Sequence, residues 1–220
     1  MGSKVKNFKP GDRVVVESGL SCGICDFCKK GSYNMCSKLM YNGFFVRYQA
    51  HPADLCYKLP STLSSAEGAL TQTLALGCQA VFSAQITPAS NVLIMGSGAT
   101  AVACALCADA VGAKKVALTC TVHASLESIR RTFGFDYVHY NHNSDPAEQL
   151  ESIFYVLKDW PDVVINCGIS DHTMSVALTA LKPCGCCILT ECDTENVTFN
   201  AFDTVMKNIR LIPSIRSNNM

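Results

Sequence analysis

The sequence has no net charge and no long apolar run. Its 220 residues include 18 Lys and Arg against 18 Asp and Glu, so the formal net charge at pH 7 is zero. Such a chain has no bulk attraction for nucleic acid or for an anionic membrane, and we expect neither as a partner. No apolar stretch approaches the ~18 residues that cross a bilayer, and the start MGSKVKNFKPGD lacks a signal-peptide core. We therefore expect a cytoplasmic protein.

Internal repeats and low-complexity tracts are also missing, so a repeat architecture is not expected. The composition, 49% hydrophobic and 16% charged, is that of a globular chain with one or two domains. Residues 1–85 are rich in Cys, Gly and Lys and have short strand-like runs, whereas residues 86–220 alternate strand-like and helical segments. We expect the boundary between two domains near Ile86–Ser90.

Six short apolar runs in the second half predict buried strands: NVLIMG, KKVALTC, DYVHYN, DVVINCG, CCILTE and RLIPSI. Helical patterns accompany them over Thr100–Val111, Leu126–Phe133, Ala147–Lys158, Thr173–Leu181 and Ala201–Asn208. Strands that alternate with helices of this length run parallel and are joined by right-handed crossovers. The predicted fold class is therefore α/β with a parallel sheet.

The turn after the first of these strands, GSGATA, has the pattern of a dinucleotide-binding loop. Gly96 permits the tight turn, Gly98 lets a pyrophosphate approach the backbone, and Ala101 is small enough for close packing of helix and strand. Ala99 and Thr100 begin a helix whose free N–H groups can bind phosphate. The strand before the turn and the helix after it favour dinucleotide binding over the alternative, a merely tight strand–helix turn.

The second strand ends at Cys120, where a dinucleotide-binding fold has an acidic residue that binds the adenosine ribose. A thiol cannot replace that carboxylate as an acceptor for two hydroxyl groups, so the affinity for NAD should fall, whereas the 2′-phosphate of NADP would be tolerated. The Arg that normally accompanies NADP is not adjacent, since Arg130 and Arg131 come about ten positions later. Three outcomes stay open: NAD, NADP or no nucleotide.

Fourteen cysteines are many for a globular chain but fewer than in small disulfide scaffolds. Cys22, Cys25, Cys28 and Cys36 form a C-x2-C-x2-C-x7-C array that predicts a closed, tetrahedral zinc site of the structural kind. Two disulfides or an iron–sulfur cluster are the alternatives. Five of the other ten cysteines could be taken for redox pairs, and we interpret them as buried apolar residues instead. They are Cys104, Cys107, Cys184, Cys186 and Cys187.

Together these motifs resemble the zinc-containing medium-chain alcohol dehydrogenases. The cysteine array runs into GSYNMC, KPGDRV precedes it at Lys9–Val14, and GSGATA follows it. The segment Asn42–Leu70 is similar to the polyol (sorbitol) branch almost position by position, and the similarity covers nearly all of the chain. The resemblance implies an incomplete GroES-like β lobe that carries a structural zinc, joined to a six-stranded Rossmann domain. It also implies oxidation of a secondary alcohol of a polyol to a ketose with NAD.

The chain departs from this family's pattern at the catalytic centre. Family members carry the catalytic-zinc Cys and a His-Glu pair upstream of the KPGDRV segment, and they continue past the last strand into a further helix. We therefore expect a sequence that is truncated at both ends. Gln72 replaces the family's Glu beside the catalytic metal, and Glu191 takes the place of a Gly next to the nicotinamide. No catalytic residue is assigned in this chain.

These features leave three hypotheses about the function. The first is a polyol dehydrogenase-like enzyme that takes a polyol as substrate and is impaired or inactive as this isolated chain. The second is a non-catalytic relative, a pseudoenzyme, that binds a dinucleotide or a protein partner and keeps zinc as a structural clip. A product with no stable fold of its own is the third. Exposed apolar surface and an open sheet edge favour association, including homo-oligomers.

Overall fold

The structure, a computed structural model, describes residues 1–139, 145–192 and 194–217. The chain divides into two compact units. One consists of Met1–Gln72 together with the residues from Arg216 onward, and the other is Thr73–Ile215. The domain boundary that the sequence suggests, between residues 85 and 86, stays a prediction.

The first unit is built from short strands and turns. Its elements are β1 (Val14–Val16), β2 (Gly19–Leu20), α1 (Asp26–Lys29), η1 (Tyr33–Met35), β3 (Met40–Tyr41), η2 (Ala53–Leu55), β4 (Cys56–Lys58) and α2 (Ser65–Ala69). Strand β1 pairs with β4 and β2 pairs with β3, both antiparallel. Among the described residues of this unit, Cys36 is the only buried one that carries a side chain. The unit therefore has almost no apolar core of its own.

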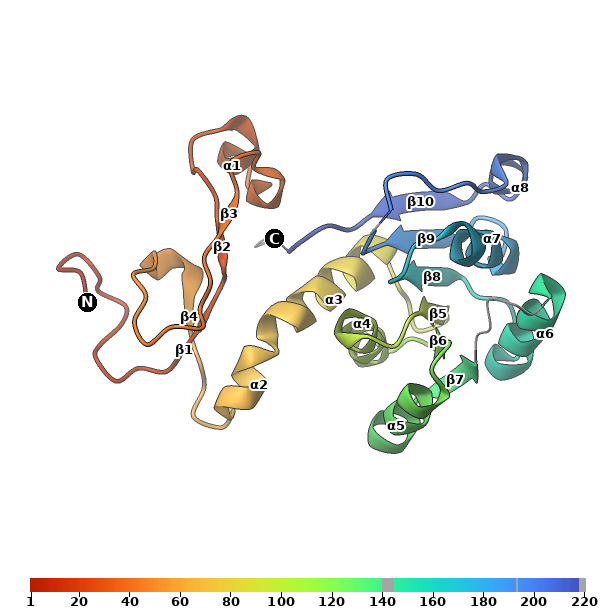
Figure 1. Cartoon of the computed structure of the whole chain (residues 1–220), viewed down its shortest axis with the longest axis horizontal. Helices are drawn as coiled ribbons and strands as arrows, with labels where there is room; N and C mark the ends of the chain where they lie inside the picture. The colour runs from red at the N-terminus through yellow and green to blue at the C-terminus, as the bar shows by residue number, and fades with distance from the viewer. Residues whose placement is uncertain (140–144, 193, 218–220) are drawn as a thin grey trace. The chain divides into compact units, whose positions relative to one another are not determined.

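The second unit contains a six-stranded parallel sheet (Figure 1). In sheet order its strands are β7 (Asp136–His139), β6 (Lys115–Cys120), β5 (Asn91–Met95), β8 (Val163–Asn166), β9 (Cys186–Leu189) and β10 (Arg210–Pro213). The first strand in the sequence, β5, lies in the centre of the sheet. The next two strands, β6 and β7, lie on one side of it, and β8, β9 and β10 follow on the other side. This is the strand order of a doubly wound dinucleotide-binding sheet, which confirms the predicted α/β fold.

Helices cover both faces of this sheet (Figure 1). They are α3 (Thr71–Ala84), α4 (Ala99–Ala110), α5 (His123–Phe133), α6 (Pro146–Leu157) and α7 (Asp171–Ala180), and α8 (Ala201–Met206) precedes β10. Because side chains alternate along a strand, Val92 and Ile94 share a core with α3, α4 and α5, whereas Leu93 and Met95 share one with α6 and α7. No helix in the described ranges is long and apolar enough to cross a membrane.

The structure differs from the sequence-based prediction at three places. Helix α5 begins at His123 rather than at Leu126, because the three residues before Leu126 carry no large apolar side chain for the pattern to detect. Helix α3, 14 residues long, lies where the pattern indicates only strand-like runs. Cys184 is exposed in a left-handed turn before β9, with φ of +64°, so its interpretation as a buried residue is wrong. The other four scattered cysteines are buried as predicted. The end of the predicted run DYVHYN lies outside the described residues.

Helices α3 and α4 are in direct backbone contact at Gly77. A Cβ atom on Gly77 would lie 2.7 Å from the carbonyl carbon of Ala103 and 2.9 Å from the backbone nitrogen of Cys104. These are backbone atoms of α4, so no flexible side chain can move aside. Packing therefore requires glycine here, although glycine costs about 1 kcal/mol relative to alanine inside a helix.

We expect Gly77→Ala to destabilise the second unit by about 1–3 kcal/mol, because overpacking at the helix crossing outweighs the gain in helix propensity. Gln79→Ala in the same helix is the control and should change the free energy of unfolding by less than about 0.5 kcal/mol. Urea unfolding followed by circular dichroism measures both. A Gly77→Ala protein as stable as the wild type would show that α3 and α4 can separate without cost.

Candidate dinucleotide site and metal centre

The residues predicted to bind a dinucleotide lie near one another at the carboxyl ends of the strands of the parallel sheet. Gly96 follows β5, Cys120 ends β6, Cys167 follows β8, and Glu191 comes shortly after β9. The strand order reverses between β5 and β8, because β6 and β7 lie on one side of β5 and β8, β9 and β10 lie on the other. Ligands of open α/β sheets bind at such a switch point, beyond the carboxyl ends of the strands. The predicted turn lies at this point.

Gly96 is enclosed by its neighbours. Its φ of +133° is a conformation that residues with a side chain rarely adopt. A Cβ atom on Gly96 would lie 3.3 Å from the Cβ of Cys167 and 3.5 Å from the Cβ of Ala101, which is itself buried. The tight turn and the close packing of helix and strand, which the sequence suggests for Gly96 and Ala101, both fit this geometry.

The start of α4 is open. Gly98 caps the helix with extended backbone, and no side chain caps this end. A Cβ atom on Gly98 would meet nothing within 4 Å, so there is free space beside it. The N–H groups of Ala99 and Thr100 have no acceptor within the helix, as at any helix start. Free donors at the positive end of a helix, beside open space, fit a pyrophosphate.

Glu191 reaches this same end of α4. The Thr100 hydroxyl donates a 2.6 Å hydrogen bond to Glu191 Oε1. The family resemblance relates Glu191 to a Gly beside the nicotinamide, whereas here its carboxylate is bonded to the first turn of the phosphate-binding helix. A carboxylate at this place gains from the positive field of the helix start and repels a pyrophosphate from the same field.

Cys120 is tied to the glycine turn. Ser97 Oγ donates a 2.7 Å hydrogen bond to the sulfur of Cys120, and the Val122 N–H donates a second one at 3.3 Å. The sulfur therefore acts as an acceptor within the protein, at the position where other members of the fold class present a carboxylate to ribose. Sequence reasoning missed the role of Ser97, because the motif allows any residue at that place.

The four cysteines of the predicted zinc array converge in the first unit. Their sulfur atoms all lie within 4.8 Å of one another, and the cysteines are free thiols rather than disulfides. The sulfur of Cys28 lies 3.4 Å from that of Cys25 and 3.9 Å from that of Cys22. Four sulfurs bound at about 2.3 Å to one tetrahedral zinc ion are about 3.8 Å apart, so these residues fit a zinc ion.

The loop backbone controls the acidity of these thiols. The backbone N–H groups of Ile24 and Cys25 lower the pKa of Cys22 to about 6. The Cys28 N–H lowers the pKa of Cys25, but hydrogen bonds that its thiol makes with neighbouring thiols, together with desolvation, raise that pKa to about 11. A thiolate therefore forms first at Cys22, and a metal ion that binds here displaces protons from the other thiols.

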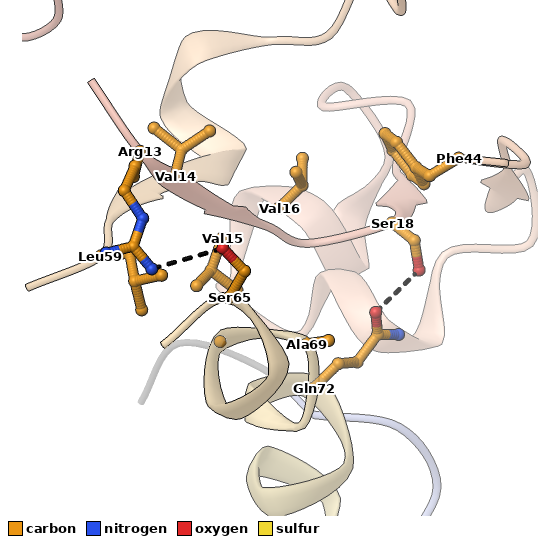
Figure 2. Close-up of a pocket in the computed structure, with 11 residues that line it drawn as sticks. Arg13, Val14, Val15, Val16, Ser18, Phe44, Leu59, Ser65, Ala69 and Gln72 are labelled. Carbon is orange, nitrogen blue, oxygen red and sulfur yellow. Dashed lines mark hydrogen bonds between the residues drawn. The ribbon is translucent and has the colours of Figure 1, made fainter. Parts of the chain in front are cut away.

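Gln72 lines a cavity of about 480 Å³ in the first unit (Figure 2). Its Oε1 accepts a 3.0 Å hydrogen bond from Ser18 Oγ. Arg13, on the opposite side, donates to the carbonyl of Leu63 at 2.8 Å and to Ser65 Oγ at 3.4 Å. The remaining wall is mainly apolar. The polar side chains that line this cavity are thus engaged with one another or with backbone, and none of them is a carboxylate or an imidazole.

Comparison with known proteins identifies the family. Residues 1–61 match the alcohol dehydrogenase GroES-like domain, and residues 96–220 match the zinc-binding dehydrogenase domain. Together with the Rossmann-type sheet and the cysteine cluster, these matches define a medium-chain dehydrogenase architecture. The chain belongs to the zinc-binding dehydrogenase family and lies close to the sorbitol dehydrogenases within it.

Individual relatives extend beyond this chain. Sorbitol dehydrogenase of Bombyx mori is 32% identical, and the match covers 98% of this chain and 64% of that enzyme. L-idonate 5-dehydrogenase of Vitis vinifera is 35% identical, and the match covers 84% of this chain and 52% of that enzyme. An alcohol dehydrogenase of Escherichia coli CFT073, solved with NADH, has a TM-score of 0.87 at 20% identity and covers 99% of this chain and 65% of its own. This likeness shows the fold alone. The chain spans less than two thirds of the length of each of these proteins.

We expect Cys36→Ser to abolish zinc binding, because a hydroxyl replaces one of the four thiolates and leaves the tetrahedron incomplete. Cys56→Ser, also in the first unit but outside the cluster, is the control. Zinc per chain after dialysis, measured by atomic emission, should fall from about one to near zero in the first variant and stay at about one in the second. Full zinc retention in Cys36→Ser would place the metal elsewhere.

We expect Glu191→Ala to tighten the binding of NADH or NADPH about tenfold, about 1.4 kcal/mol, because it removes a negative charge from the phosphate-binding end of α4. Glu195→Ala, a change of the same charge slightly further along the chain, should leave the affinity unchanged. Calorimetric titration measures both. Weaker binding in Glu191→Ala would mean that the carboxylate holds the ligand rather than competing with it.

Proposed function

We propose that this protein binds NAD or NADP at the glycine turn and that its chemistry is that of the polyol branch: oxidation of a secondary alcohol of a polyol to a ketose. The observation that carries the proposal is the uncapped start of α4 beside the open space at Gly98, at the switch point of a parallel sheet. The names of the similar proteins, a sorbitol dehydrogenase and an idonate dehydrogenase, support the polyol as substrate class.

In this proposal the N–H groups at the start of α4 hold the pyrophosphate, and Cys120 lies beside the adenosine ribose. When bound, the nicotinamide supplies the hydride acceptor. The cysteine cluster holds a zinc ion of the structural kind. Its four thiolates would complete the tetrahedron and leave no position for an alcohol.

We propose further that turnover is impaired in this chain by itself. Removing a proton and a hydride from an alcohol requires an electrophile at the developing alkoxide. Within the part of the chain that the structure describes, the cysteine cluster is the only group of three or more His, Cys, Asp or Glu that could hold a metal ion. Gln72 is a neutral amide bonded to Ser18, and it supplies neither negative charge nor a titrating group.

The second candidate function is binding without turnover, of a dinucleotide or of a protein partner. The observation in its favour is the hydrogen bond from Thr100 to Glu191, which holds a carboxylate near the positive end of α4; this charge disfavours a pyrophosphate there and so favours the protein partner. Under this alternative zinc remains as a structural clip.

We also propose that the protein is located in a reducing cytoplasm and that it associates with further copies of itself. None of the fourteen cysteines is in a disulfide, which suits a compartment where glutathione keeps thiols reduced. Large apolar side chains such as Phe45 and Tyr48 are fully exposed and favour self-association.

Calorimetric titration of the zinc-loaded chain with NAD, NADH and NADPH tests the binding step. A dissociation constant below ~100 μM for any of them, about 5.5 kcal/mol, supports the proposed site. No detectable heat with folded protein would refute dinucleotide binding. Assays of sorbitol oxidation with the same preparation then separate the two candidates, because the enzyme turns over, however slowly, and the binder does not.

We expect Cys120→Asp to tighten NAD binding about tenfold and to weaken NADPH binding, because a carboxylate accepts hydrogen bonds from both ribose hydroxyls and repels a 2′-phosphate. Cys120→Ser, which replaces the sulfur with an uncharged oxygen acceptor, is the control and should not separate the two cofactors. Titration with both dinucleotides gives the ratio of affinities. An unchanged ratio in Cys120→Asp would show that residue 120 does not face the ribose.

A further inference from the structure

Two cysteines that the proposed function does not use lie side by side in the second unit. The sulfur of Cys78, on α3, is 3.3 Å from the sulfur of Cys107, on α4. This distance is shorter than an ordinary contact between two sulfur atoms. Cys78 is exposed, whereas Cys107 is buried, with 9% of its surface accessible. The pair therefore combines an exposed cysteine with one that is almost inaccessible to solvent.

The contact between the two helices favours a bond between these sulfurs. Gly77, the neighbour of Cys78, touches the backbone of Ala103, which lies one turn before Cys107. A disulfide needs two Cβ atoms about 3.5–4.5 Å apart, which requires backbones in close proximity. Where two helices are already in backbone contact, a bond between residues next to the crossing needs little movement.

Burial also disfavours ionisation of the Cys107 thiol. Burial, together with the hydrogen bond to Cys78, raises the pKa of Cys107 to about 12. Cys107 therefore stays protonated at neutral pH, and Cys78, the exposed member of the pair, is the cysteine that meets a dissolved oxidant first. Cys104, one turn earlier on α4, is fully buried and is shielded from a dissolved reagent.

We propose that Cys78 and Cys107 form an oxidative modification site, in which a hydroperoxide converts the two thiols into a disulfide between α3 and α4. The sulfur of Cys78 attacks the peroxide O–O bond, becomes a sulfenic acid and releases water or an alcohol. The sulfur of Cys107 then attacks the sulfur of Cys78, its proton leaves with the hydroxyl as water, and the S–S bond forms. The peroxide gains the two electrons that the thiols lose.

The bond would join residues 29 positions apart. The segment between them contains β5 and the entire glycine turn, from Gly96 to Ala101. Oxidation would thus tie the helix that carries the candidate nucleotide-binding turn to the neighbouring helix, and the proposal does not depend on whether a nucleotide binds there.

Peptide mapping of the oxidised protein tests the proposal. Zinc-loaded protein, in which the cysteine cluster is occupied, is treated with one equivalent of hydrogen peroxide, alkylated and digested without reductant. Chymotrypsin is used, because no Lys or Arg lies between residues 58 and 114 and trypsin would leave both cysteines in one peptide. We expect a linked peptide pair that contains Cys78 and Cys107, lighter by two hydrogens than the separate peptides and released by dithiothreitol. Cys78 found as a sulfinic acid or as a free alkylated thiol, with no linked pair, would overturn the proposal.

Variants test the order of the two steps. In Cys107→Ala, Cys78 should remain as a sulfenic acid that dimedone traps, and in Cys78→Ala, Cys107 should stay reduced at the same dose. Cys184→Ala, which removes another exposed cysteine of the same unit, is the matched control and should form the linked pair as the wild type does. Oxidation of Cys107 in Cys78→Ala would contradict the assignment of Cys78 as the first nucleophile.

Discussion

The register of the central strands is the constraint on which the candidate dinucleotide site depends. Met95, the last residue of β5, pairs with Thr119 of β6 and with Asn166 of β8, so β5 and β8 end at the same level and β6 ends one residue further. The Gly96 N–H donates to the Thr119 carbonyl at 2.8 Å, and the Cys167 N–H donates to the Met95 carbonyl at 2.9 Å. A register shift of one residue between β5 and either neighbouring strand would move the glycine turn away from Thr119 and Cys167. It would also place the side chains of the shifted strand on the opposite face of the sheet.

Charge, more than shape, distinguishes this edge of the sheet from an ordinary dinucleotide site. The glycine turn has the open space and the free helix start that a pyrophosphate needs. The carboxylate normally found beside the ribose is missing at Cys120, and a carboxylate is present instead at the start of α4, through Glu191. Relative to the pattern of the fold class, the carboxylate is absent where the ribose would lie and present where the pyrophosphate would lie, and the proposed shift in cofactor preference and affinity rests on this difference.

Much of the second unit could be predicted from the sequence, because each of its strands is an apolar run and most of its helices lie between glycine, asparagine or proline boundaries. The array of four cysteines was equally predictable, since the spacing of ligands in one loop is local information. Contacts between distant segments could not be predicted. The bond from Thr100 to Glu191, the bond from Ser97 to Cys120 and the approach of Cys78 to Cys107 depend on strand order and helix packing. Helix α3 was missed because its small residues, which allow contact with α4, give a weak apolar pattern.

The near absence of buried side chains in the first unit changes what holds that unit together. With Cys36 as its only buried side chain among the described residues, it has little hydrophobic free energy to offset the loss of chain entropy. A metal ion bound by the four sulfurs would stabilise this unit in place of an apolar core. The folded fraction of the unit would then depend on the concentration of free zinc. Each tenfold change in free zinc would shift its stability by about 1.4 kcal/mol while the sheet of the second unit stays unaffected. Metal supply would therefore act as a selective control on the first unit alone.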